Sequence, residues 1–130
     1  MTVAPSANAA AAVRFSGIYY DSPGSDTGSN SSLNHEWVRI HNYGAKVRVL
    51  TGWTVRDTSR HVFRFPHFRL RPHSSVTIHT GKGKDSRTDL YWGRSWYVWN
   101  NDGDTALLKN RAGGRADRRH YGGGGSFTRC

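Results

Sequence analysis

The sequence predicts an all-β protein whose short strands form a two-layered sandwich. Apolar and polar residues alternate over short runs, as in residues 36–42, and such alternation is typical of strands with one buried face. Turn-forming Gly, Pro, Asn and Asp residues separate these runs about every 8–12 residues, which is the spacing expected of a sandwich. No segment keeps the period of a helix. We therefore expect about seven to nine short strands.

The first part of the chain alternates clearly between strand and loop patterns. Residues 13–20 (VRFSGIYY) predict the first strand, because apolar and polar side chains alternate at its start. Residues 21–33 are dense in Ser, Gly, Asp, Asn and Pro and predict a loop. Residues 36–42 predict the second strand, with Val38 and Ile40 pointing into the core.

The later strands are shorter and are bounded by turn signals. Val47, Val49 and Trp53 are expected to supply core side chains from the next pair of strands. A strand at residues 61–65 ends at Pro66, because proline cannot donate a hydrogen bond to a ladder. The remaining strands are expected at residues 75–80, 105–108 and 115–121. An Asp-Gly pair precedes the second of these and favours a tight turn with positive φ.

The length of 130 residues fits one domain with flexible ends. We expect a flexible, Ala-rich N-terminal arm over residues 1–12, the sandwich over residues 13–121, and a flexible, Gly-rich tail over residues 122–130. The arm resembles the small-residue stretch that follows a secretory cleavage site, so we expect a secreted, extracellular protein. No apolar run is long enough to predict membrane insertion.

The formal net charge of +10 gives the chain a strongly basic character. Such a surface favours anionic partners, including nucleic acid, an acidic wall polymer or an acidic protein face. An Arg-rich composition is also what a GC-rich genome produces, and a positive charge keeps a secreted protein soluble. Both interpretations of the charge stay open at this point.

Motifs of hydrolases and metalloenzymes are missing from the sequence. There is no G-x-S-x-G elbow, and His35-Glu36 is not followed by the second histidine of H-E-x-x-H. Cys130 is the only cysteine, so no internal disulfide and no cysteine-based metal site can form. We expect no catalytic residues, no enzymatic activity and no cofactor.

Acidic and amide side chains in two loops need separate consideration. Asp21, Asp26 and Asn30 alternate with glycines and form a weak candidate calcium site, because hard cations bind oxygen ligands on a turning backbone. The same residue types also compose ordinary loops. Asp102 and Asp104 flank a glycine, and we interpret them as side chains that cap backbone donors of a turn.

Aromatic side chains are concentrated between residues 91 and 99. We assign Trp53 and Trp99 to the core or its edge. Trp92 and Trp96 are the tryptophans that we expect to be exposed, and an exposed tryptophan is a candidate binding residue.

Basic side chains are concentrated near the end of the chain. Arg115, Arg118 and Arg119 lie along the last predicted strand, where charged residues either protect a sheet edge or dock an acidic partner. A second basic group, in the loop after residue 80, comprises Lys82, Lys84 and Arg87. The sequence leaves open whether the two groups form one patch.

Four short motifs follow one another in a fixed order. They are Asn-His-Glu-Trp-Val-Arg-Ile at residues 34–40, Gly-Trp-Thr-Val-Arg-Asp at 52–57, Val-Thr-Ile-His-Thr-Gly at 76–81, and Trp-Asn-Asn-Asp-Gly-Asp-Thr-Ala at 99–106. Each reads as a strand that enters or leaves a tight turn. Together they resemble the lamin tail domain, which is best known from nuclear lamins and is common in secreted bacterial proteins. The resemblance covers residues 13–121.

The resemblance implies an immunoglobulin-like β-sandwich of lamin-tail type that binds or scaffolds and carries no catalytic residues. We therefore expect a non-catalytic, secreted adaptor that holds other protein subunits together in a larger extracellular bacterial assembly. The candidate partner-binding residues are Ala9, Ala10, Ala11, Ala12, Trp92, Trp96, Arg115, Arg118 and Arg119. The alternative is a basic module that binds extracellular DNA or an acidic cell-wall polymer.

Overall fold

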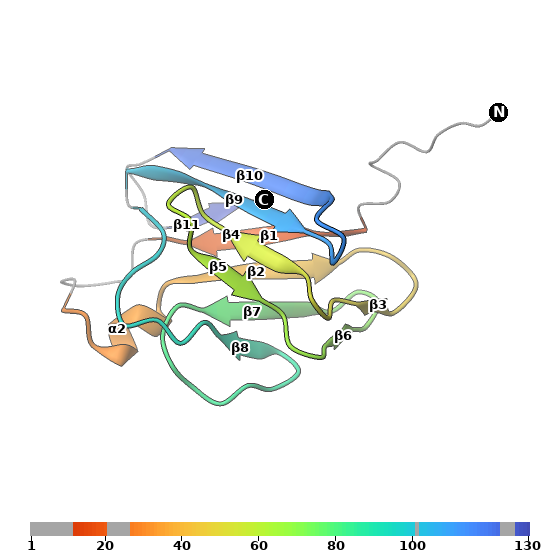
Figure 1. The fold of residues 1–130 in the computed structure, drawn as a ribbon, viewed down its shortest axis with the longest axis horizontal. Coiled ribbons are helices and arrows are strands. Elements are labelled where there is room, and N and C mark those ends of the chain that lie inside the picture. The colour runs from red at the N-terminus through yellow and green to blue at the C-terminus, as the bar shows by residue number, and fades with distance from the viewer. Residues whose placement is uncertain (1–11, 21–26, 101, 123–126) are drawn as a thin grey trace.

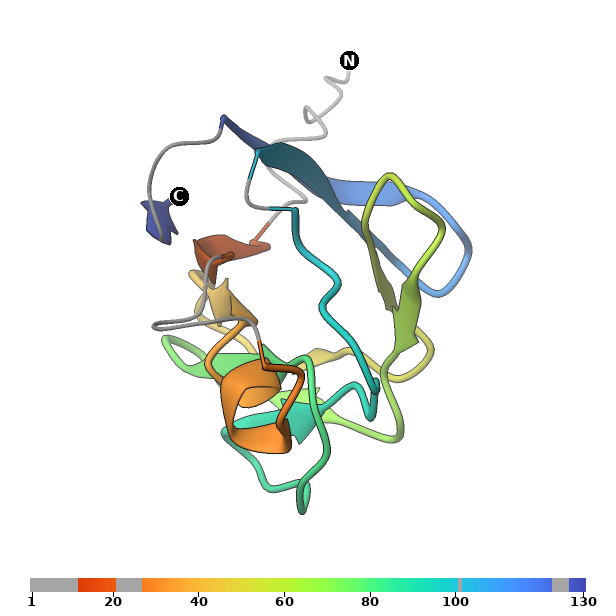
Figure 2. The ribbon, with the colours of Figure 1, turned by 90° about the vertical axis from the view of Figure 1, so that its left-hand side faces the viewer.

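Two β-sheets packed face to face form the body of the protein (Figures 1 and 2). The computed structural model describes residues 12–20, 27–100, 102–122 and 127–130. In that part of the chain, nine strands belong to the two main sheets, and two more form a small sheet at the rim. The predicted all-β, immunoglobulin-like sandwich is therefore confirmed.

The first sheet has five strands, which lie side by side in the order β11-β1-β2-β7-β8. Their bounds are β1 (Val13–Tyr19), β2 (Trp37–Asn42), β7 (Ser75–His79), β8 (Asp89–Tyr91) and β11 (Phe127–Arg129). Neighbouring strands are antiparallel, except that β8 pairs parallel with β7.

The second sheet has four antiparallel strands in the order β10-β9-β4-β5. Their bounds are β4 (Thr54–Arg56), β5 (Val62–Arg64), β9 (Gly103–Lys109) and β10 (Arg115–Gly122). The small sheet pairs β3 (Arg48–Val49) with β6 (Arg69–Leu70). It continues the sandwich at the end opposite the short helix α2 (Asn30–Asn34), as Figure 1 shows.

The core lies between the two main sheets and follows the predicted alternation along β2, where Val38 and Ile40 are fully buried. One prediction about the core is wrong. Val49 in β3 and Val47 just before it are exposed, because their side chains point away from the sandwich interior. Leu50, the next residue, is fully buried in their place.

The segment predicted as a loop over residues 21–33 contains the start of α2. The Ser29 hydroxyl caps this helix by accepting a hydrogen bond from the Ser32 amide. Leu33 anchors the helix by burying its side chain. The sequence prediction missed the helix because five residues are too few to show a helical period.

Both chain ends were predicted to be flexible. The predicted flexible tail at residues 122–130 contains β11, which pairs with Gly17–Tyr19 of β1, so this part of the prediction is wrong. Residues 1–11 of the predicted arm lie outside the described residues.

Among the described residues, no helix has the length and apolarity needed to cross a membrane.

Candidate functional site

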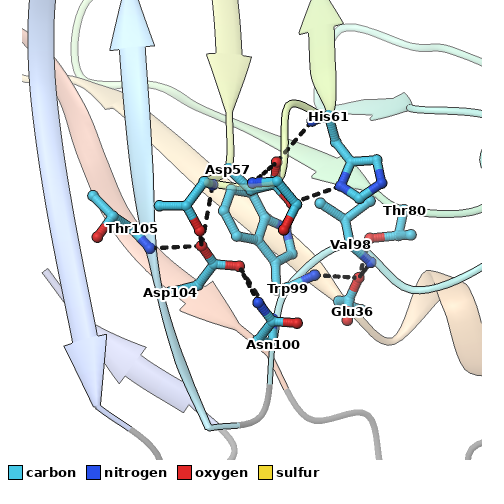
Figure 3. Close-up of polar contacts among 11 residues, drawn as sticks. Glu36, Asp57, His61, Thr80, Val98, Trp99, Asn100, Asp104 and Thr105 are labelled. Carbon is cyan, nitrogen blue, oxygen red and sulfur yellow. Dashed lines mark hydrogen bonds and ion pairs between the residues drawn. The ribbon is translucent and has the colours of Figure 1, made fainter.

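Polar side chains from all four sequence motifs are buried together at one end of the sandwich (Figure 3). They are Glu36, Asp57, Thr80 and Asp104, each less than a tenth exposed. A buried charge is costly unless hydrogen bonds stabilise it, so the partners of each carboxylate indicate what the cluster does.

Glu36 lies directly before β2 and joins three parts of the chain. Its Oε1 accepts a hydrogen bond of 2.7 Å from the Thr80 hydroxyl. The same oxygen accepts hydrogen bonds from the backbone amides of Val98 at 2.7 Å and Trp99 at 3.2 Å. Glu36 therefore ties the segment before β9 to the first sheet.

Asp104 and Asp57 organise the neighbouring turns. Asp104 Oδ1 accepts a hydrogen bond from the Thr58 hydroxyl at 2.8 Å, and its Oδ2 accepts one from the backbone amide of Asn100 at 3.3 Å. Asp57 accepts from the backbone amide of His61 at 2.8 Å and from its Nδ1 at 2.6 Å. The interpretation of Asp104 as a turn-capping side chain is confirmed, whereas Asp102 is exposed.

The histidine and carboxylate pairs do not form a catalytic triad in the described part of the chain. In a triad the histidine lies between the acid and the nucleophile and has one ring nitrogen free for each. His79 instead contacts Asp89 through Nε2 at 2.8 Å and the carbonyl of Asn34 through Nδ1 at 2.9 Å. His61 contacts Asp57 through Nδ1 at 2.6 Å, but no hydroxyl or thiol of the described residues is hydrogen-bonded to its other ring nitrogen. The hydrogen bond from His79 holds the pKa of Asp89 below its usual value, so this carboxylate stays ionised at the surface.

The metal-binding side chains that the structure describes do not cluster either. Within the described residues, no group of three His, Cys, Asp or Glu side chains is placed to hold a metal ion. Asp21 and Asp26 of the weak calcium candidate lie outside those residues. Asn30 uses its amide group to hold the backbone of Lys82, accepting at 2.7 Å and donating at 2.9 Å. The calcium site stays a prediction.

Trp96 is the most exposed large hydrophobic side chain in the described residues, with 57% of its surface accessible. The segment that carries it is fixed, because the Tyr97 hydroxyl bonds both the Ser32 hydroxyl and the Gly28 amide. The Trp96 ring lies over Gly28, where a Cβ would come within 2.3 Å of it. The predicted exposure of Trp96 is confirmed, and its ring packs against the Gly28 backbone.

The other tryptophan that we expected to be exposed is half-buried. Trp92 packs edge-on against Phe63 at 5.9 Å and Trp99 at 6.1 Å between ring centroids. The expectation for Trp92 is therefore wrong, because the chain after β8 turns inward and closes the edge of the core. Trp99 is buried and Trp53 packs against the core, as predicted.

The two basic groups lie on different sides of the molecule. Arg115 and Arg118 are exposed on β10, an edge strand of the second sheet, and Arg119 is half-buried and donates to the carbonyl of Arg129 at 3.0 Å. Figures 1 and 2 place β10 at the top and the loop between β7 and β8 at the bottom. The two groups therefore do not form one patch.

Among the described residues, the arginine and lysine charges also lack carboxylate partners. Both ion pairs between described residues involve histidine, and no described arginine or lysine pairs with a described carboxylate. The reason lies partly in the buried cluster, since Glu36, Asp57 and Asp104 direct their oxygens to the interior.

An aromatic cluster on the outer face of the first sheet was missed by the sequence prediction. Tyr19, Trp37 and Phe127 lie on adjacent strands with ring centroids 5.7–6.1 Å apart, and the Arg39 guanidinium lies 5.3 Å from the Trp37 ring. Only the pairing of β11 with β1 brings Phe127 to this cluster. No local sequence signal could have shown that pairing.

The comparison with protein families agrees with this geometry. The family model described as Lamin Tail Domain matches residues 6–123. The match includes all four motifs that supply the buried polar cluster, and it ends before β11. No curated protein matches the chain significantly. The matched family is one of non-enzymatic binding domains.

Proposed function

The chain belongs to the lamin tail domain family, and from this membership we propose that it is a non-catalytic adaptor that docks other protein subunits. The observation that carries the proposal is Trp96, a large exposed ring on a fixed segment. As part of the same proposal, the adaptor works in a secreted bacterial assembly, as secreted bacterial proteins that contain this domain suggest.

The support beneath Trp96 favours binding. Tryptophan is enriched among the residues that dominate protein interfaces. A ring that is already fixed in the free protein loses little freedom on binding, so more of its contact energy contributes to affinity. Glu36 holds the backbone two and three residues after Trp96, and the hydroxyl of Tyr97, the next residue, accepts a hydrogen bond from the Gly28 amide.

The buried carboxylates bind backbone amides inside the domain, and this supports a role without catalysis. A catalytic acid or base must reach a reacting atom in a cleft. Glu36 and Asp104 instead direct oxygens to backbone amides inside the domain. These bonds stabilise the loops at the Trp96 end, which is what a binding module requires.

The test is affinity capture from the native culture medium, with washing at high salt and mass spectrometry of the retained proteins. We expect the parent protein to retain a small set of partners in fixed ratio, and Trp96→Ala to lose them. Val49→Ala is the matched control, because Val49 is 54% exposed and lies at the opposite end of the sandwich. Equal capture by Trp96→Ala would contradict docking through this residue.

A truncated chain tests the arm separately. Ala12 stays bound to the domain, because its carbonyl accepts a 2.8 Å hydrogen bond from the Tyr43 amide. Deleting residues 1–11 therefore leaves this contact intact. If the arm docks into a partner, capture is lost in the truncated protein while the domain stays folded. Unchanged capture would place the docking surface on the sandwich alone.

A second candidate function is binding of a polyanion such as extracellular DNA or an acidic wall polymer. The observation that favours it is the absence of ion pairs between described carboxylates and any described arginine or lysine. Contacts to phosphates release counterions, so such binding weakens steeply as salt rises. A retained polymer that is lost at high salt, with no stoichiometric protein, would support this function against the adaptor.

A further inference from the structure

A basic groove runs between β6 and the turn that precedes β8. It consists of two adjoining hollows of about 250 and 320 Å³, which share Arg69 and Arg87 as lining residues. Leu70 lines the first hollow, and the buried side chains of Phe68 and Leu90 line the second. Together the hollows reach the size of ordinary small-ligand sites.

Three arginines surround the first hollow. Arg69, Arg71 and Arg87 are all exposed, and no described carboxylate forms an ion pair with any of them. The hydroxyl-bearing residues Ser74, Ser75 and Thr88 complete the lining. Three guanidinium groups around one hollow repel each other, and a phosphate would relieve that repulsion through paired, charge-assisted hydrogen bonds.

The walls of the groove are held in place before any ligand binds. On one side, Arg87 lies in a turn that is closed by the Ser86 amide donating to the Asp89 carbonyl at 2.8 Å. On the other side, the buried Asn42 side chain donates to the carbonyl of Leu70 at 3.0 Å and fixes the strand between Arg69 and Arg71. The backbone segments that carry these arginines are therefore held by hydrogen bonds in the free protein.

The second hollow differs from the first in charge. It contains the Asp85 carboxylate, which accepts a 3.1 Å hydrogen bond from the Tyr91 amide. A phosphate would be repelled here, whereas the apolar side chains of Phe68 and Leu90 suit an uncharged group. The groove thus favours a ligand in which a phosphate adjoins a less polar unit.

We propose that the basic groove binds the phosphodiester backbone of a nucleic-acid strand. One phosphate lies in the first hollow against Arg69, Arg71 and Arg87, and the adjoining sugar lies in the second. This assignment gives the second candidate function a specific site and rests on that function. It places the site away from the arginines of β10, the basic residues that the sequence singled out.

The test compares two variants that lose the same charge. A fluorescein-labelled single strand of about 15 nucleotides, a length that exceeds one typical binding site, is titrated by anisotropy at about 50 and 200 mM NaCl. The groove variant is Arg69→Gln with Arg87→Gln. The control is Arg115→Gln with Arg118→Gln, two exposed positions on the opposite side of the molecule.

The groove variant should bind about tenfold more weakly at the lower salt, since each lost arginine removes charge-assisted bonds. Its plot of log affinity against log salt should be shallower by about 0.7, because the one phosphate contact that the groove makes on a single strand contributes about 0.7. The control should match the parent protein within about twofold. Thermal unfolding of all three proteins checks that the exposed substitutions leave the fold intact.

Each contrary result overturns a different statement. Equal losses in the two variants would show binding by general charge, so the groove assignment would fall while polyanion binding stands. Binding that is unaffected in the groove variant and lost in the control would move the site to β10. No binding by the parent protein would overturn both the groove and the second candidate function. Equal competition by a sulfated polysaccharide would refute recognition of phosphodiesters.

Discussion

Replacing Glu36 with alanine removes the acceptor of three buried hydrogen bonds, and we expect the domain to lose about 4 kcal/mol of stability. The Val98 and Trp99 amides would be left inside without a partner, at a cost of about 1–3 kcal/mol each. Loss of the bond from the Thr80 hydroxyl adds about 1 kcal/mol. For a domain of this size the midpoint of thermal unfolding should fall by about 15 °C.

The assay is urea and thermal unfolding followed by tryptophan fluorescence and circular dichroism. Glu36→Gln should cost about 2 kcal/mol, because its amide oxygen still accepts hydrogen bonds but carries no charge. Asp102→Ala is the control, since Asp102 is an exposed carboxylate near the cluster, and it should change stability by less than about 0.5 kcal/mol. A loss below about 1 kcal/mol in Glu36→Ala would refute the view that this side chain holds the Trp96 end.

Three further changes test other parts of the structure. Gly28→Ala places a Cβ within 2.3 Å of the Trp96 ring at a φ of +74°, so it should shift tryptophan emission and weaken partner capture as Trp96→Ala does; unchanged capture would contradict the role of this support. Burial, reinforced by neighbouring positive groups, lowers the pKa of His41 below 6.5. The folded state then binds a proton less readily than the unfolded chain, so the free energy of unfolding should fall as pH drops below about 6.5. His41→Gln should make this fall with pH less steep, as measured by urea unfolding at a series of pH values. Phe127→Ala should cost about 1 kcal/mol in thermal unfolding through lost ring contacts with Tyr19 and Trp37, and no change would show that these ring contacts add nothing to stability.

Local patterns were sufficient for much of the fold. The alternation around Val38 and Ile40 correctly gave a strand with one buried face, because that pattern depends only on the strand's own geometry. The turn role of Asp104 followed from its place beside a glycine, since such capping bonds are local. The exposure of Trp96 was also foreseen, although the same expectation was wrong for Trp92.

Contacts between distant segments could not be predicted. Val49 alternates like a core residue, and only the position of β3 at the rim shows that it faces outward. The Glu36 carboxylate meets the Val98 amide across 62 residues, so no spacing rule reveals that bond. In the same way, Arg69 and Arg87 come together only because β6 and the turn before β8 are neighbours in the folded chain.

The most direct test of the account is a double-mutant cycle on the binding of a captured partner. Affinities are measured for the parent protein, Glu36→Gln, Trp96→Ala and the double variant. If Glu36 acts by positioning Trp96, Glu36→Gln weakens binding in the parent protein and has almost no further effect in Trp96→Ala. Additive losses, or full affinity of Glu36→Gln, would contradict the claim that the motif side chains support the docking surface.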